Sequence, residues 1–275
     1  MQYGRITYNK IENIDVFSHM KKRCNYQPCM FNFQNVAGDA KYVRLCVIDT
    51  GVPQHSIFNH DLYKSKNFTK SGSVYDVYGH STALAGVLQA NKNNIKGMIP
   101  SADIYYAKAI DDEPSMSSLQ NIIEAILWCV IKEVDVILMS FSTPINHSVF
   151  ADVVKKAYKA GVAMIAASGD NTVKTHDLEY PALYKEVFSV GHSYKLKNNQ
   201  NLIISGQCKG VIMPYEEYDT TFLANKYIKF GGSSVCAAAV AGLACLCVQE
   251  MRRKGIDPRN PQLLYDTLAK YTVKN

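Results

Sequence analysis

Residues 43–51 read Val-Arg-Leu-Cys-Val-Ile-Asp-Thr-Gly, a largely apolar run that stops abruptly at an acid, a hydroxyl and a glycine. A strand buried on both faces of a parallel sheet has this nearly unbroken apolar composition. The run therefore predicts a central strand over residues 43–48. Functional side chains in such sheets gather outside the carboxyl ends of the strands, and this strand ends in Asp49.

Short apolar strands alternate with amphipathic helices along the rest of the chain. Further strands are expected at 104–109, 134–139 and 162–167. Helices are expected at 119–131, 149–160, 233–254 and in a short last segment to about residue 270. Ser117 and Gln120 form a capping-box pattern before the first of these helices. The alternation predicts an α/β fold of three layers, a mainly parallel, doubly wound sheet with helices on both faces.

We interpret the chain as one domain, residues 41–275, with an N-terminal extension of residues 1–40 packed on it. The length of 275 residues suits a single domain of this class. Residues 185–230 show short strands and turns, and we expect them to be antiparallel and peripheral to the main sheet.

Composition and charge argue against several classes of protein. Hydrophobic residues make up 47% and charged residues 20%, as in ordinary soluble globular proteins. The net charge of +6 is scattered along the chain, so we expect no nucleic-acid partner. The N-terminus has no apolar signal segment, and the small-apolar run 235–248 is shorter than the roughly 18 residues of a membrane span. We therefore expect a cytoplasmic protein with no membrane partner.

Eight cysteines are present. Five of them lie inside apolar runs, as buried free thiols do: Cys46, Cys129, Cys236, Cys245 and Cys247. Cys24 and Cys29 have a spacing that could hold a metal, but no second pair of Cys or His residues matches it. We expect reduced cysteines and no metal site.

Asp49 is the first candidate for chemistry, because an acid at the end of a buried strand would be partly buried at the functional edge of the sheet. Asp and Gly are also common in turns that follow strands, and that interpretation stays open. The triplet Asp49-Thr50-Gly51 also suggests an aspartic protease. Those folds are all-β, and the α/β alternation of this chain argues against them.

His80 and Ser234 each lie at the start of a predicted helix of small residues. Gly79 precedes His80, which places an imidazole at the entrance of the helix; the alternative is a surface histidine in a helix cap. Two glycines precede Ser233 and Ser234, where free backbone N–H groups and the helix dipole would favour an oxyanion. N-capping explains one serine but not the run of small residues behind it.

Together, and in this order, these segments resemble the Asp, His and Ser motifs of the subtilisin-like peptidases, or subtilases (peptidase family S8). The serine motif of that family reads Gly-Thr-Ser-Met-Ala-x-Pro-His-Val-Ala-Gly. Residues 232–242 match it with Ser233 for Thr, Val235 for Met, Ala238 for Pro and Ala239 for His. Connecting stretches are similar as well, at 97–102, 136–142, 180–182 and 187–191. The resemblance covers about residues 42–270.

The resemblance implies a subtilisin-like fold and a serine endopeptidase with Asp49, His80 and Ser234 as its catalytic triad. Ser234 would attack the scissile carbonyl, His80 would transfer the proton, and Asp49 would orient His80. A peptide or protein is the implied substrate, and no cofactor is required. Residues 90–97 resemble the calcium loop of the family in shortened form, which leaves calcium binding open.

One position departs from the family pattern. Asp170 occupies the place of the asparagine that donates to the oxyanion, and an ionised carboxylate cannot donate. Asp170 could be protonated, Asn171 could turn in to donate, or the backbone N–H of Ser234 could act nearly alone. Kexin-like convertases, a branch of the same family, carry Asp here and are active. The resemblance therefore implies a slow or selective peptidase.

The resemblance also implies the substrate-binding residues Ser140, Phe141, Ser142, Ser168, Gly169 and Glu179. The first three would form an extended edge that pairs with the substrate backbone. Glu179, with Asp177 nearby, falls at the base of the primary specificity pocket and would favour a basic residue before the cut. The acids at 111–113 lie on the substrate-binding edge. All these acids can also be solvated loop residues.

The small size and the selective cleft suit maturation of a particular precursor or leader peptide. Two alternatives stay open: a catalytically weak or inactive peptide-binding scaffold, and a peptide ligase or macrocyclase that shares the acyl-enzyme. The oligomeric state also stays open. Only 48 residues precede Asp49, so a folding pro-segment was either removed or is not needed.

Overall fold

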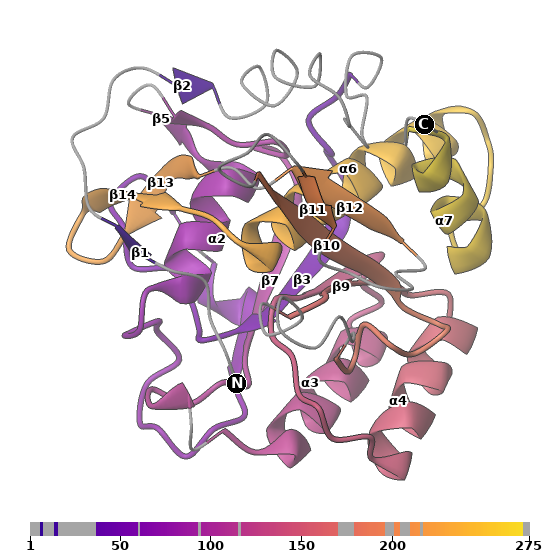
Figure 1. Cartoon of the computed structure of the whole chain (residues 1–275), viewed down its shortest axis with the longest axis horizontal. Helices are drawn as coiled ribbons and strands as arrows, with labels where there is room; N and C mark the ends of the chain where they lie inside the picture. Colours follow the sequence, from indigo (N-terminus) through magenta and orange to yellow (C-terminus); the bar gives the residue numbers. More distant parts are fainter. Residues whose placement is uncertain are drawn as a thin grey trace.

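Figure 1 shows a computed structural model of the chain, which describes residues 6–7, 14–15, 37–59, 61–92, 95–114, 117–169, 179–195, 201–203, 210–214 and 217–271. The main sheet has the strand order β11-β10-β9-β8-β3-β7-β4, with β12 paired to β10. Six neighbouring strands are parallel: β10 (Phe188–Lys195), β9 (Ala163–Ala167), β8 (Val136–Met139), β3 (Arg44–Asp49), β7 (Asp103–Lys108) and β4 (Ser65–Asn67). This sheet confirms the predicted fold class and contains all four strands expected between residues 43 and 167.

Helices cover both faces of the sheet and form the three predicted layers. One face carries α2 (His80–Gln89) and α6 (Ser233–Arg253), with α7 (Pro261–Lys270) beside α6. The other face carries α3 (Leu119–Ile131) and α4 (Ser148–Lys159), at the bottom of Figure 1.

Strand β3 shows why both faces are covered. Leu45 and Val47 belong to the core beneath α2 and α6, whereas Cys46 and Ile48 belong to the core beneath α3 and α4. Successive side chains of a strand point to opposite faces, so a run that is apolar at every position needs a helix layer on each side.

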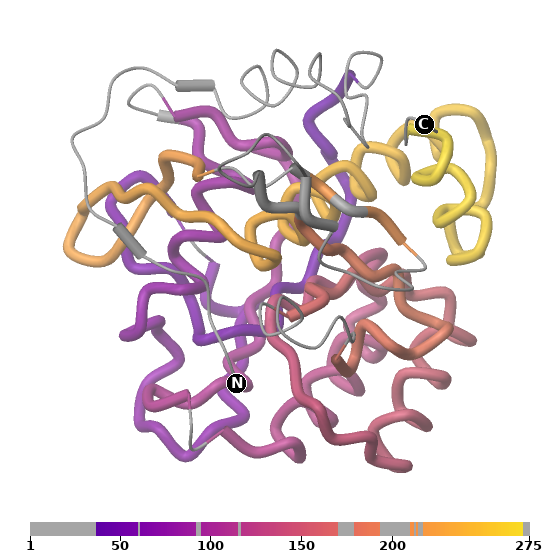
Figure 2. Tube along the Cα trace, in the orientation of Figure 1, coloured from indigo at the N-terminus to yellow at the C-terminus, as the bar shows by residue number. Residues whose placement is uncertain are grey.

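The remaining described elements are short: β1 (Ile6–Thr7), β2 (Ile14–Asp15), β5 (Asn91–Lys92), β6 (Ile95–Lys96), β11 (Asn201–Ile203), β12 (Val211–Pro214), β13 (Tyr218–Phe222), β14 (Lys226–Phe230) and the 3-10 helix η2 (Leu62–Lys64). Figure 2 shows the orange β13–β14 hairpin lying beside the purple helix α2, although the two are far apart in the sequence.

Helix α6 is the central core helix. Within the described part of the chain it is the one helix long and apolar enough to cross a membrane, yet 89% of its most apolar window is buried inside the protein. Its small residues allow close packing, since a Cβ at Gly242 would lie 3.1 Å from the Cβ of Met98. All five cysteines predicted to be buried free thiols are buried and unbridged.

Residues 185–230 correct one prediction. β10 joins the main sheet parallel to β9, and β12 pairs parallel with β10, so this region is neither wholly antiparallel nor wholly peripheral. β11 and the β13–β14 hairpin are antiparallel, as expected. β12 approaches β10 because Gly210 lies against Ser189, where a Cβ would be 1.8 Å from the carbonyl oxygen. A contact between such distant segments leaves no periodic pattern in the sequence.

The start of α3 differs by one residue from the predicted cap. Ser118 is the N-cap, and its hydroxyl accepts from the backbone N–H of Gln120 at 3.2 Å. The hydroxyl of Ser117 instead accepts from the backbone N–H of Asp111 at 2.9 Å. The neighbouring loop therefore decides which serine caps the helix.

Two short pieces of the predicted N-terminal extension are described. β1 pairs antiparallel with β14, and β2 pairs parallel with β6. The other residues before position 37 lie outside the described residues, Cys24 and Cys29 among them. The division of the chain at residue 40 stays a prediction.

Candidate active site

The three candidate triad residues lie at the ends of three separate elements. Asp49 is the last residue of β3, His80 is the first residue of α2, and Ser234 is the second residue of α6. All three are buried, with at most 2% of each residue exposed. The strand end and the two helix starts thus supply the side chains, as the sequence pattern predicts.

Gly51 allows the chain to turn directly after Asp49. Its φ is +133°, and a Cβ there would lie 2.5 Å from the carbonyl oxygen of Val74. The N–H of Val52 donates to that carbonyl at 2.9 Å, and the N–H of Asp76 donates to the carbonyl of Val52 at 2.8 Å. The strand end that carries Asp49 is therefore held against the segment that leads to α2.

Asp49 and His80 form a two-oxygen contact. Nδ1 of His80 lies 2.8 Å from Oδ1 and 2.9 Å from Oδ2 of Asp49. The backbone N–H of Thr50 also donates to Oδ1, at 2.8 Å, and holds the carboxylate in place. A carboxylate at Nδ1 favours the tautomer with its proton on Nδ1, which leaves Nε2 as the proton acceptor.

Two aromatic rings of the β13–β14 hairpin pack around the start of α2. Phe230 meets the imidazole of His80 edge-on, with ring centroids 5.5 Å apart. Gly79, with φ +99°, lies so close to Phe222 that a Cβ would be 2.2 Å from its ring. Phe230 is also four residues before Ser234, so the segment that delivers the serine starts in contact with the histidine.

Ser234 is tied to the end of β8. Its hydroxyl donates to the carbonyl of Ser140 at 3.2 Å, and the hydroxyl of Ser140 donates to the carbonyl of Ser234 at 3.3 Å. The first turn of α6 also presents backbone N–H groups and the positive end of the helix dipole beside Ser234. This arrangement can stabilise an oxyanion that forms next to the serine.

Comparison with known proteins shows the family of the chain. The sequence model of the subtilase family, peptidase S8, matches residues 40–272. The chain belongs to the subtilase family. It is a subtilisin-like serine endopeptidase, as its motifs predict.

Individual subtilases are similar over most of the chain. The major intracellular serine protease of Bacillus subtilis (strain 168) is 31% identical over 217 residues, which cover 75% of this chain and 68% of that protein. The intracellular serine protease of Paenibacillus polymyxa is 29% identical, and the match covers 84% of this chain and 74% of that protein. Subtilisin DY of Bacillus licheniformis is 29% identical, and the match covers 76% of this chain and 77% of that protein.

Three of the predicted substrate-binding residues of this subtilase come together. The hydroxyl of Ser142 donates to Oε2 of Glu179 at 2.5 Å. Gly169 has φ +89°, and a Cβ there would lie 2.8 Å from Oγ of Ser142 and 3.0 Å from Oε2 of Glu179. These residues follow the carboxyl ends of β8 and β9, on the same side of the sheet as Asp49.

The other predicted substrate-binding residues frame this cluster. Ser140 is buried against Ser234 of α6, whereas Phe141 is buried in the core beneath α3 and α4. The N–H of Glu179 donates to the carbonyl of Ser168 at 3.4 Å. Backbone hydrogen bonds of 2.8 and 2.9 Å between Thr143 and Tyr180 close the cluster on its far side.

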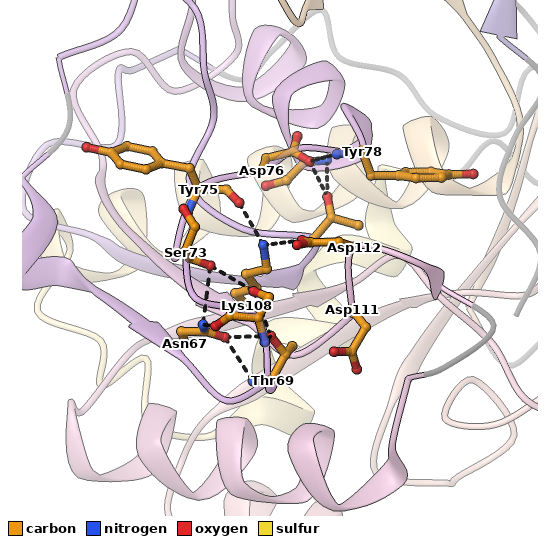
Figure 3. Close-up of polar contacts among 12 residues, drawn as sticks. Asn67, Thr69, Ser73, Tyr75, Asp76, Tyr78, Lys108, Asp111 and Asp112 are labelled. Atoms are coloured by element: carbon orange, nitrogen blue, oxygen red, sulfur yellow. Dashed lines mark hydrogen bonds and ion pairs between the residues drawn. The ribbon is translucent and has the colours of Figure 1, made fainter.

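The acids at 111–113 have varied surroundings. Asp112 pairs with the fully buried Lys108 at 2.5 Å, and the ammonium of Lys108 also donates to the carbonyl of Tyr75 at 2.7 Å (Figure 3). Asp112 therefore neutralises a buried cation and holds two loops together. Asp111 accepts from the amide of Asn121 at 3.5 Å, and Glu113 is exposed.

Some predicted residues lie outside the described residues. These are Asp170, Asn171 and Asp177, so the oxyanion-hole assignment stays a prediction. In the shortened calcium loop, β5 and β6 form a hairpin, and Asn93 and Asn94 between them are also outside. Within the described ranges, no group of three or more His, Cys, Asp or Glu residues could hold a metal ion.

The structure adds two residues that the motifs did not single out. Thr50 bridges Asp49 to a second buried carboxylate, Asp76. Asp76 precedes His80 by four residues, just before a helix whose N-cap is a glycine. Because glycine has no side chain that can cap the helix, a nearby acid is a candidate for that role, and this signal could have revealed Asp76.

Proposed function

We propose that this subtilase cleaves peptide bonds through an acyl-enzyme on Ser234, with His80 as general base and Asp49 as its orienting group. The observation that carries the proposal is the contact of both Asp49 oxygens with Nδ1 of His80, beside the helix start that bears Ser234. Asp49 holds the imidazole with Nε2 free of the carboxylate, so Nε2 can take the hydroxyl proton of the serine.

The reaction then has two halves. Ser234 attacks the scissile carbonyl as His80 takes its proton, and His80 passes that proton to the leaving amine. Water, activated by His80, then releases the acyl group. Asp49 stays ionised and stabilises the imidazolium in both halves. The backbone N–H of Ser234, assisted by Asp170 or Asn171, is proposed to bind the oxyanion.

Replacement of the nucleophile tests this assignment. Ser234→Ala should lower peptide-bond cleavage by several orders of magnitude, on the order of 10⁶ for loss of a triad serine. Ser234 of the unmodified protein should be labelled by a fluorophosphonate. Ser233→Ala is the matched control, because it removes the neighbouring buried serine and should keep the labelling. Undiminished cleavage by Ser234→Ala would refute the assignment.

The cluster of Ser142, Gly169 and Glu179 is proposed to bind the substrate side chain before the cut. Ser140 contacts Ser234 directly, so the segment 140–142 runs from the nucleophile to the carboxylate. Glu179 is half-buried and is held by one hydroxyl. A carboxylate in such a site recognises Lys or, preferably, Arg. Ser140, Phe141 and Ser168 would align the substrate backbone.

Selective processing of a precursor or leader peptide in the cytoplasm is the proposed setting. It is supported by the names of two similar proteins, which are called intracellular serine proteases, and by the carboxylate in the proposed pocket. A ligase would form the same acyl-enzyme and transfer it to an amine instead of water. The masses of the products from a defined peptide separate hydrolysis from ligation.

A further inference from the structure

The hydroxyl of Thr50 lies between two buried carboxylates. Its Oγ1 is 3.1 Å from Oδ1 of Asp49 and 2.9 Å from Oδ1 of Asp76. All three residues are at most 1% exposed. The backbone N–H of Ser81 donates to the same Oγ1 at 3.1 Å and fixes the position of the oxygen.

Asp76 is held by four other donors. The N–H groups of Tyr78 and Gly79 donate to its Oδ1 at 3.0 and 2.7 Å. The N–H and the hydroxyl of Thr82 donate to its Oδ2 at 2.8 and 2.6 Å. Burial raises the pKa of Asp76, and these donors oppose that shift. Figure 3 shows Asp76 beside Tyr78, just before α2 begins.

Asp76 is also the cap of α2. Gly79 occupies the N-cap position and has no side chain to accept from the first turn. Asp76 accepts from the N–H of Thr82 in its place. A plain structural role for Asp76 is therefore capping, and any further role has to be distinguished from it.

The Thr50 hydroxyl has one proton and two carboxylate acceptors, and the five donors around Asp76 favour its ionised form. When His80 is neutral, Asp49 carries an uncompensated charge and attracts that proton. When His80 is an imidazolium, its Nδ1–H forms a charge-assisted hydrogen bond with Asp49, and Asp76 becomes the better acceptor. The two O···O distances are close enough that rotation about one bond, without movement of the oxygen, exchanges the acceptor.

We propose that the hydroxyl proton of Thr50 points to Asp49 while His80 is neutral and turns to Asp76 when His80 takes the proton of Ser234. The inference rests on the triad proposed above. Thr50 and Asp76 are then positioning residues that act through Asp49. No covalent bond to either residue forms or breaks, since the transferred proton moves only from Ser234 to His80 and onward.

The consequence is a preference for the transition state. In the resting enzyme the Thr50 hydroxyl donates to Asp49 and offsets part of its negative charge. The carboxylate then orients the neutral imidazole of His80 without favouring its protonation at Nε2. As His80 becomes charged, the hydroxyl turns away and the full charge of Asp49 faces the imidazolium. Only interactions that strengthen in the transition state raise the rate of the chemical step.

Other charges on the elements around His80 are paired or in solvent. Lys108 of β7 pairs with Asp112, and Asp219 of β13 pairs with Lys229 of β14 at 3.3 Å. The rest are ion-paired or exposed: Asp103 on β7, Arg44 on β3, Lys96 on β6, Lys226 on β14, and Glu250, Arg252 and Arg253 at the far end of α6. Asp49 and Asp76 are thus the carboxylates that the Thr50 hydroxyl contacts.

The rate at which a fluorophosphonate labels Ser234, measured against pH, tests the inference, because labelling requires neutral His80. Thr50→Val removes the hydroxyl that donates to Asp49, so the carboxylate favours the imidazolium more strongly. The pH midpoint of labelling should therefore rise by about half a pH unit or more. Asp76→Asn removes a nearby negative charge and leaves the Thr50 hydroxyl donating to Asp49. The pH midpoint of labelling should therefore fall by a similar amount. Thr50→Ser keeps a hydroxyl and should restore the midpoint of the unmodified protein.

A purely structural role of the contacts around Asp76 is distinguished by Thr82→Val, which removes the hydroxyl donor to Asp76, keeps the capping N–H, and leaves Thr50 and Asp49 untouched. It should lower the thermal midpoint of unfolding and leave the pH midpoint of labelling in place. If Asp76→Asn does not fold, the test depends on the other two variants: the pH midpoint of labelling should rise in Thr50→Val and return to that of the unmodified protein in Thr50→Ser. Unchanged midpoints, or shifts in the same direction, would overturn this inference alone. Failure of the unmodified protein to label on Ser234 would overturn the proposed triad as well.

Discussion

Single residues show how the surroundings of an acid decide its role in this subtilase. Asp49 receives the N–H of Thr50 and Nδ1 of His80, which suits an orienting group. Asp112 is paired with Lys108, a cation buried completely, and is therefore committed to the fold. Within the described residues, the carboxylate of Glu179 accepts from the Ser142 hydroxyl and is half-buried, so its charge can meet an incoming cation.

Glu179→Gln should remove a preference for Arg or Lys before the cut. Loss of one charge-assisted contact corresponds to a fall of about tenfold to a hundredfold in kcat/KM for basic peptides, with little change for leucine peptides. A peptide panel that varies this one position measures it. Glu113→Gln, which removes an exposed acid from the 111–113 loop, is the matched control. A wild-type enzyme that is indifferent to basic residues would contradict the pocket role.

Whole elements meet where α2 packs on β13. The hydroxyls of Thr220 and Thr221 donate to the carbonyls of Ala83 and Thr82 at 2.6 and 2.7 Å. Gly86 makes this approach feasible, because a Cβ there would lie 2.1 Å from Oγ1 of Thr220 and 2.7 Å from the backbone nitrogen of Thr221. The position of His80 at the start of α2 thus depends on a hairpin more than a hundred residues later in the chain.

Gly86→Ala should destabilise the protein. Helix propensity alone would favour alanine by about 1 kcal/mol. The contact with the backbone of Thr221 should outweigh it and lower the free energy of unfolding by about 1–3 kcal/mol. Urea unfolding in a Ser234→Ala background, which prevents self-digestion, measures the difference. Gly72→Ala is the control, since a Cβ there meets nothing within 4 Å and the change should be near zero. A stabilised Gly86→Ala variant would show that α2 and β13 can separate freely.

For the molecule as a whole, one buried histidine links stability to pH. His55 is 8% exposed, its Nδ1 accepts from the N–H of Ile57, and its ring lies edge-on to Tyr227 with centroids 5.0 Å apart. Within the described residues, Nε2 of His55 has no hydrogen-bond partner. Burial lowers the pKa of His55 below its ordinary value of 6.5, although backbone contacts oppose the shift. Folding therefore favours the neutral form of this ring.

The stability of the protein should fall with acid because of His55. Its folded pKa is below its unfolded value, so the unfolded state binds more protons below that value. The contribution of His55 is fully present above pH 6.5 and is lost as the pH falls below it. Urea unfolding of Ser234→Ala protein between about pH 5 and pH 8 should show this slope. His55→Gln should flatten it, whereas His147→Gln, at an exposed histidine, should not. An equal slope in all three proteins would contradict the assignment.

Much of the candidate active site could be predicted because its signals are local. The buried run before Asp49, the glycine before His80 and the glycine pair before Ser234 each mark an element end by strand or helix chemistry alone. Parallel strands end at one edge, so Asp49 was expected at the functional side of the sheet. The cap of α3 could not be predicted to the residue, because the contact of Ser117 with Asp111 comes from another loop.

The sequence by itself determined the α/β class, the strands and helices around residues 43–167, and the residues at their ends, since periodicity and caps act over a few neighbours. Only the tertiary structure decided the parallel pairing of β10 with β9 and β12, the hydrogen bond of Ser142 to Glu179, and the position of Thr50 between Asp49 and Asp76. The Thr50–Asp76 and Ser142–Glu179 hydrogen bonds join residues 26 and 37 positions apart, and the strand pairings join whole segments of the chain. They depend on which segments lie side by side, and no local pattern records that.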